Sequence, residues 1–308
     1  MIRLIMRNVL YTILISIAIV FFVHLGLLMA ANFGLRGTPQ PIPEVVAEAV
    51  AQSGAYFARL FQGDLGSTTG RYVRPVGEVI AEAYPKSLGL LAASLSIALV
   101  LGLLFGLISA VKRHSQMSLL VFVVTLLGIS TPSFFAAVLI QVVAIRWYVT
   151  TGSRLVPLGG FGWDEHLIMP ALVLAARPVA QVARVTFVTL SDILEKDYVR
   201  TARAKGVREM WVVNKHALLN AAVPVLTALG VSLRFSLSSL PVVEFIFSWP
   251  GMGYMLLRAI GAGDLALATG LSLAIGITFM VVETLLELSY RIFDPRLREA
   301  QAGLVEAA

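Results

Sequence analysis

Residues 197–206 read Asp-Tyr-Val-Arg-Thr-Ala-Arg-Ala-Lys-Gly and lie in the longest strongly charged interruption of the apolar C-terminal half. Asp197 suits the cap of a short helix, because its carboxylate accepts unpaired backbone N–H groups and faces the positive end of the helix dipole. Gly206 suits the left-handed residue that ends a helix. A second helical stretch is predicted over 207–219. The segment therefore predicts two short helices, joined at a glycine, that project from a membrane and offer a contact surface to another protein.

The composition around this segment is that of a membrane protein. Of the 308 residues, 58% are hydrophobic and 14% are charged, whereas soluble domains carry about 25% charged residues. A helix needs about 20 apolar residues to cross a bilayer, and six stretches meet this need. They are 8–31, 87–111, 118–147, 166–190, 221–247 and 265–290. We expect an all-α integral membrane protein with six transmembrane helices and no separate soluble enzyme domain.

Two of these stretches carry packing signals. Gly102, Gly106 and Ser109 lie at near-helical spacing in the second stretch, where small residues allow helices to approach closely in lipid. Pro132 interrupts the third stretch. Because proline lacks the backbone donor and clashes with the preceding turn, a kink is predicted near Ser130.

The predicted topology places both termini and the charged loop in the cytoplasm. The parts are a first transmembrane helix at 1–31, an outer segment at 32–84, a core of five spans at 85–292 with its loop at 191–218, and a tail at 293–308. Lys and Arg are more numerous in the inner segments than in the outer ones, as the positive-inside rule requires. That rule alone would also account for a basic loop. The first apolar run exceeds the 7–15 residues of a signal-peptide core, so it is expected to stay uncleaved.

The charged loop also resembles a known family. Residues 198–206, together with His216 and Asn-Ala-Ala-Val-Pro-Val-Leu at 220–226, look like the cytoplasmic "EAA" loop of ABC-importer permeases, most of all the dipeptide/oligopeptide permease family. Gly-Asp-Leu-Gly at 63–66 and Asp-Pro-Arg at 294–296 are similar to the same family. Arg200 stands where the general motif has Glu, and the Pro common near Leu219 is absent. The resemblance implies a type I ABC-importer permease fold in a bacterial inner membrane.

The resemblance also implies a set of partners. They are a second homologous permease, which makes a heterodimer, two cytoplasmic ATPase subunits and an external binding protein. ATP and Mg would be bound by the ATPases, so no cofactor is expected in this chain. The coupling helix that docks on the ATPase would be formed by the residues of the loop that match the motif. These are Tyr198, Val199, Arg200, Thr201, Ala202, Arg203, Ala204, Lys205, Gly206 and His216.

The sequence offers no catalytic, cofactor or metal site. Lys86 is the one Lys followed by Ser, and Pro85 stands where a phosphate-binding loop needs Gly. The four His have no metal-ligand spacing, and there is no Cys. The net charge of +6 is spread along the chain without a dense basic patch, so nucleic acid is not an expected partner.

Charged residues inside the predicted spans are candidates for a substrate path. An arginine at a helix centre costs roughly 2.5–3.5 kcal/mol on insertion scales and usually faces a partner or a wet cavity. The candidates are Arg177, Arg184, Arg234 and Glu244. A path lined by the arginines would meet a substrate carboxylate. The same residues also have structural explanations. One is ion pairing of the arginines with Glu244, Glu283 or Glu287. The other is that the long side chain of Arg184 reaches the lipid headgroups.

An alternative function rests on the last span. Glu283 and Glu287 are four residues apart and share one helix face. A self-sufficient ion- or proton-coupled carrier would use such a pair as a relay. The sequence does not name the cargo, which in similar permeases ranges over dipeptides, oligopeptides, glutathione, nickel chelates, opines and oligosaccharides.

Overall fold

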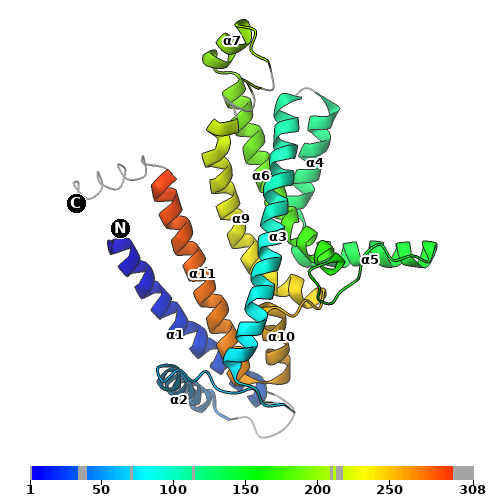
Figure 1. The fold of residues 1–308 in the computed structure, drawn as a ribbon. Helices are drawn as coiled ribbons and strands as arrows, with labels where there is room; N and C mark the ends of the chain where they lie inside the picture. The colour runs from blue at the N-terminus through cyan, green and yellow to red at the C-terminus, as the bar shows by residue number, and fades with distance from the viewer. Residues whose placement is uncertain are drawn as a thin grey trace. The chain divides into compact units, whose positions relative to one another are not determined.

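The computed structural model of the chain describes residues 2–33, 40–69, 72–112, 115–208, 211–212 and 218–293. Within these ranges the backbone is almost entirely helical, and the pairing of Ser67 with Pro75 is an isolated bridge. Six helices are long and apolar enough to cross a membrane, so the expected all-α membrane fold is confirmed (Figure 1). The chain forms two compact units, unit 1 (Met1–Leu88 with Ser248–Glu287) and unit 2 (Gly89–Phe247 with Leu288–Ala308).

Unit 1 combines helices from both ends of the chain. They are α1 (Ile2–Asn32), α2 (Ile42–Leu60), the first part of α3 (Val76–Val111), α10 (Met252–Ala262) and most of α11 (Leu265–Phe293). Val20 of α1, Tyr56 of α2 and Leu273 of α11 form one buried cluster. Met252 of α10 packs in a second cluster with residues of α3 and α11. Burial of these side chains joins segments that are far apart in sequence.

Unit 2 holds both candidate sites. It contains the rest of α3, α4 (Gln116–Ser130), α5 (Ser133–Thr151), the 3-10 turn η1 (Glu165–Leu167), α6 (Ile168–Leu194), α7 (Asp197–Ala204) and α9 (Leu219–Ile246). Helix α6 lies against α4 and α9. A Cβ added at Gly102 would lie 2.6 Å from Val182 Cβ, and one at Gly106 would lie 2.6 Å from the Ala183 carbonyl oxygen. The close packing predicted for these glycines is confirmed.

The predicted third span is two helices and not one kinked helix. Helix α4 ends at Ser130 and α5 begins at Ser133. Thr131 is extended, with φ −83° and ψ 121°, because a residue before proline is driven out of the helical region. Pro132 has no N–H with which to resume the hydrogen-bond ladder. In Figure 1, α5 runs across the direction of α4 and α6, so the chain turns a full corner where a kink was predicted.

Candidate functional site

The predicted docking segment begins as helix α7, which follows α6 after a short turn. Its N-cap is Lys196, whose backbone is extended and whose side chain makes no capping hydrogen bond. The prediction that Asp197 caps the helix is therefore wrong, because the extended residue that a cap requires falls one position earlier. Asp197 is the first helical residue, and its Oδ1 lies 3.7 Å from Arg200 Nη1. Its carboxylate still faces the positive end of the helix dipole.

The C-terminal end of α7 is a Schellman motif built on Gly206. The φ angle of Gly206 is +76°, a left-handed conformation that glycine adopts without steric cost. Gly206 N–H donates to the Arg203 carbonyl at 2.9 Å, and Val207 N–H donates to the Ala202 carbonyl at 3.2 Å. These two bonds satisfy carbonyls that the last helical turn would leave unpaired. The predicted left-handed turn at Gly206 is present and fixes the end of the helix.

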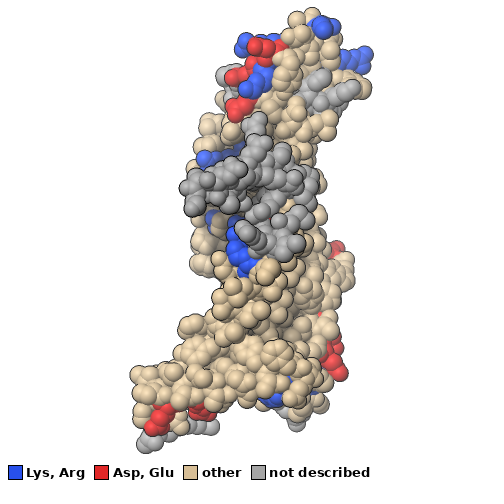
Figure 2. Space-filling model, turned by 90° about the vertical axis from the view of Figure 1, so that its left-hand side faces the viewer, with Lys and Arg blue, Asp and Glu red and all other residues tan. Residues whose placement is uncertain are grey.

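Helix α7 has one buried face and one exposed basic face. Val199 is fully buried, and the Tyr198 hydroxyl accepts a hydrogen bond from Asn220 Nδ2 of α9 at 3.4 Å. Residues that face solvent include Arg200, Thr201, Arg203, Ala204 and Lys205. Figure 2 shows Lys and Arg gathered beside Asp and Glu at this end of unit 2. The segment is therefore an anchored helix with an exposed, mainly basic surface.

The rest of the predicted docking segment is described only in part. His216 lies outside the described residues, as does most of the second helix predicted over 207–219. Trp211 within that stretch is 60% exposed, whereas Val212 is fully buried. An exposed tryptophan close to α7 extends the accessible surface beyond the helix itself.

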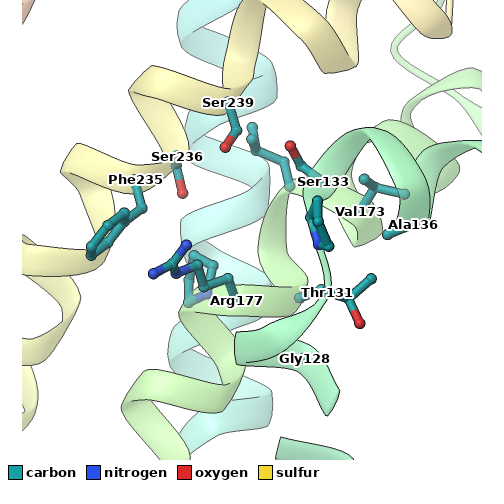
Figure 3. A pocket seen from close by; sticks show the side chains of 13 residues that line it. Gly128, Thr131, Ser133, Ala136, Val173, Arg177, Phe235, Ser236 and Ser239 are labelled. Carbon is teal, nitrogen blue, oxygen red and sulfur yellow. The ribbon is translucent and has the colours of Figure 1, made fainter. Parts of the chain in front are cut away.

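A second candidate site lies where α4 turns into α5, against α6 and α9 (Figure 3). It is a cavity of about 60 Å³, which has room for several water molecules or a small polar group. The guanidinium carbon of Arg177 on α6 lies 3.9 Å from the ring centroid of Phe235 on α9, a cation–π contact. In the described part of the chain, Arg177 has no carboxylate partner.

Serine hydroxyls from two helices line the same cavity, namely those of Ser133, Ser236 and Ser239. Ser236 is 2% exposed, and its Oγ finds no hydrogen-bond partner among the described residues. Figure 3 shows the Ser236 oxygen and the Arg177 guanidinium directed into the same space. Because a buried hydroxyl without a partner costs about 1–3 kcal/mol, the cavity suits a polar occupant.

An apolar cavity of about 200 Å³ adjoins this pocket, and Gly128 and Ala176 line both. Its walls come from α3, α4 and α6, with Leu101, Phe105 and Leu172 among them. A polar site and an apolar site therefore share one wall. This arrangement fits a ligand that carries a charged group next to an apolar one.

The pocket contains one of the four residues predicted to line a substrate path, Arg177. Arg184 is exposed further along α6, Arg234 is partly buried on α9, and Glu244 is fully buried near the end of α9. None of these three lines the cavity, and their place on a path stays a prediction. Sequence reasoning missed Phe235 among the pocket residues. Pro132 was the signal in the sequence that could have located the pocket. A corner between two helices leaves part of a neighbouring span uncovered, and the pocket lies at this corner.

Residues 102–299 match the family described as "Binding-protein-dependent transport system inner membrane component". The chain belongs to this family. It is a membrane-spanning permease subunit of a binding-protein-dependent ABC importer, a multi-pass protein that works with an ATPase and a substrate-binding protein.

Three similar proteins share most of their length with the permease. A peptide permease protein of Brucella suis biovar 1 is 38% identical over 268 residues, which cover 85% of this chain and 82% of that protein. A peptide transport system permease protein of Brucella abortus is 35% identical, with 81% and 80% covered. The glutathione transport system permease protein GsiC of Escherichia coli O6:H1 is 36% identical, with 79% and 78% covered.

Family membership overturns the alternative of a self-sufficient carrier driven by Glu283 and Glu287. The contacts of Glu287 agree with this correction. Arg7 Nη2 of α1 donates to Glu287 Oε1 at 2.6 Å, and Asn8 Nδ2 donates to Oε2 at 3.1 Å. In the permease this carboxylate joins α1 to α11 within unit 1.

Proposed function

We propose that α7 is the coupling helix on which an ATPase subunit docks, and that its displacement drives alternating access in the permease. The observation that carries the proposal is the construction of α7. It is anchored at Val199, closed at Gly206, and exposed along its basic face. A helix held at one face and one end moves as a rigid body, whereas an unsupported loop would absorb an applied force. Residues 198–206 and His216 form the proposed contact.

The proposed orientation places α7 in the cytoplasm of a bacterial cell, with the chain in the inner membrane. The concentration of Lys and Arg around α7 supports this placement, since basic residues collect on the inner side. Six membrane crossings bring the two ends of a chain to the same side, so both termini would also be cytoplasmic.

The proposed complex contains a second, homologous permease subunit as a heterodimer partner and two ATPase subunits. ATP and Mg would be held by those ATPases and not by this chain. An external binding protein would deliver the cargo. The names of the similar proteins, which refer to peptide and glutathione transport, support peptides or similar small solutes as cargo.

Substitution of Gly206 tests the coupling proposal. Val at this position resists the left-handed conformation, so Gly206→Val should distort the end of α7 while the membrane spans still insert. With the complete complex in vesicles, ATP-driven uptake of a labelled tripeptide should fall at least about tenfold, which corresponds to about 1.4 kcal/mol of lost coupling. Uptake at the parent level in this variant would overturn the proposal.

Gly206→Asn is the matched control. Asn tolerates the left-handed region better than other non-glycine residues, so this variant should keep most of the uptake. If Asn and Val lowered uptake equally, the loss would come from a close contact that another molecule makes at Gly206 itself. It would then not come from the left-handed conformation that ends the helix.

A further inference from the structure

We infer that the pocket around Arg177 binds the terminal carboxylate of a peptide on its way through the permease. The inference rests on the proposed function, because it assumes that the chain carries a peptide cargo. It adds a chemical class, a free carboxylate, and a place in the chain, the cavity at the α4–α5 corner.

The surroundings of Arg177 leave its hydrogen-bond donors available for such a group. The guanidinium carbon lies 3.9 Å from the Phe235 ring centroid, and this contact with the ring uses none of the N–H donors that a guanidinium carries in its plane. A carboxylate can accept two of these donors side by side, and such charge-assisted pairs are roughly twice as strong as hydrogen bonds between neutral groups. No carboxylate of the described residues pairs with Arg177, so the carboxylate of a bound ligand can take this place.

The hydroxyl groups of α9 complete the site. Ser236 and Ser239 are three residues apart and therefore lie on one face of the helix, and both line the cavity with Arg177. The buried Ser236 hydroxyl lacks a partner among the described residues. A carboxylate in the cavity would accept a hydrogen bond from it and so remove the cost of leaving it unpaired.

A lipid phosphate has similar chemistry, but the position of Arg177 favours the peptide. Arg177 follows the start of α6 at Ile168 by nine residues, which is about 14 Å along the helix axis. A headgroup at the membrane surface would have to descend by about that distance to reach it. A peptide that crosses the membrane passes this depth, and the adjoining apolar cavity accommodates the side chain next to its carboxylate.

The absence of cysteine from the sequence allows a direct test. Ser239→Cys places one thiol in the pocket and keeps Arg177 and Ser236. The complete complex is labelled in nanodiscs without nucleotide, with an anionic sulfonatoethyl or a cationic trimethylammonioethyl methanethiosulfonate. A cationic wall attracts anions, so the anionic reagent should react faster, and adding Arg177→Gln should lower the anionic-to-cationic rate ratio by about tenfold.

Trileucine should slow the labelling, whereas trileucinamide, which lacks the carboxylate, should not.

The control is Arg154→Gln. Arg154 is also an exposed arginine beside an aromatic ring, and its guanidinium carbon lies 5.6 Å from the centroid of the Tyr148 ring. It lies outside the pocket. It should leave the rate ratio unchanged. Equal protection by both peptides, an unchanged ratio in Arg177→Gln, or no labelling by either reagent would overturn the inference. Protection by added phosphatidylglycerol without protection by trileucine would assign the site to lipid and overturn it as well.

The outcome is separable from that of the coupling proposal. Labelling needs neither ATP nor an ATPase movement, so Gly206→Val in the Ser239→Cys background should label at the same rate. If Gly206→Val transported normally but labelling behaved as expected, the coupling proposal alone would fail. If labelling failed while Gly206→Val blocked uptake, the carboxylate site alone would fail.

Discussion

Arg7 of unit 1 and Arg177 of unit 2 lie in apolar helices but meet different partners. Arg7 bonds to Glu287 at 2.6 Å, and the same carboxylate accepts from Asn8. Arg177 lies on the Phe235 ring and faces a cavity lined by hydroxyl groups. A paired charge ties two helices together, whereas a charge whose donors face a cavity can bind a ligand. Substitutions in unit 1 should therefore change stability, and substitutions at the unit 2 sites should change transport.

The largest effect is expected at the anchor of α7. Val199 is fully buried, so Val199→Asp places a carboxylate in an apolar site and should detach α7 from unit 2. Burial of this carboxylate costs several kcal/mol of desolvation, which opposes packing of α7 against the rest of unit 2. We therefore expect ATP-driven uptake to fall by at least about tenfold. Filter assays on vesicles that hold the complete complex measure this loss. Val199→Ile should keep uptake, and uptake within about twofold of the parent in Val199→Asp would contradict the role of the anchor.

The next effect concerns the close helix packing inside unit 2. A Cβ at Gly106 would collide with Thr186 and with the Ala183 carbonyl, so Gly106→Ala should destabilise the protein by about 1–3 kcal/mol. The thermal unfolding midpoint of the purified complex reports the change. Gly54→Ala is the control, because Gly54 lies in α2 with nothing within 4 Å of the added carbon. Equal midpoints in the two variants would contradict close packing of α3 on α6.

A smaller effect is expected from the ion pair of unit 1. Glu287→Gln removes the charge that Arg7 meets, and a partly exposed pair contributes about 1 kcal/mol or less. The unfolding midpoint should fall slightly, while uptake per folded complex should remain ATP-driven with an unchanged pH profile. Loss of uptake in a fully folded variant would show that Glu287 serves transport and would erase the contrast with Arg177.

The smallest effect should come from an exposed pair before α6. The His166 ring hydrogen-bonds Asp164 Oδ1 at 2.7 Å, and this bond, followed by that from the His166 backbone, holds the pKa of Asp164 below its ordinary value. A lowered folded-state pKa means that the stabilisation is present above the unfolded-state value of about 3.9 and is lost as pH falls through the folded-state value. Asp164→Asn should therefore weaken the acid dependence of the unfolding midpoint. An unchanged acid dependence would show that the pair contributes nothing to stability.

The elements that sequence alone predicted are those set by local chemistry. Apolar length locates the spans, and the glycine at 206 sets the end of α7 because few other residues adopt its φ angle. The start of α3 at Val76 was not predicted, since its first turns carry Glu78, Glu82 and Lys86 and fail an apolar criterion. The helix propensities of Glu and Lys are similar to those of good apolar helix formers, so the helix extends beyond the apolar stretch.

The pocket could not be predicted in full because it depends on long-range register. Arg177 was singled out by its charge within a span, but its contact with Phe235 depends on how α6 and α9 lie against each other. The corner at Thr131 and Pro132 was expected as a kink. A proline signals interruption of a helix, but the angle of the turn follows from the packing of α4 and α5 with their neighbours.

Docking of α7 on an ATPase in the cytoplasm can be measured at Thr201, which is exposed in the middle of α7. Thr201→Cys, the one cysteine of the chain, is coupled to a photo-reactive benzophenone in membranes that hold the complete complex, and a parallel sample is treated as intact cells with a membrane-impermeant maleimide. We expect a cross-link to the ATPase subunit and no maleimide reaction until the membrane is opened. Phe61→Cys, at an 88% exposed position after α2, should react in intact cells. Reaction of Thr201→Cys in intact cells, or no cross-link in a complex that still transports, would show that α7 does not dock on an ATPase in the cytoplasm.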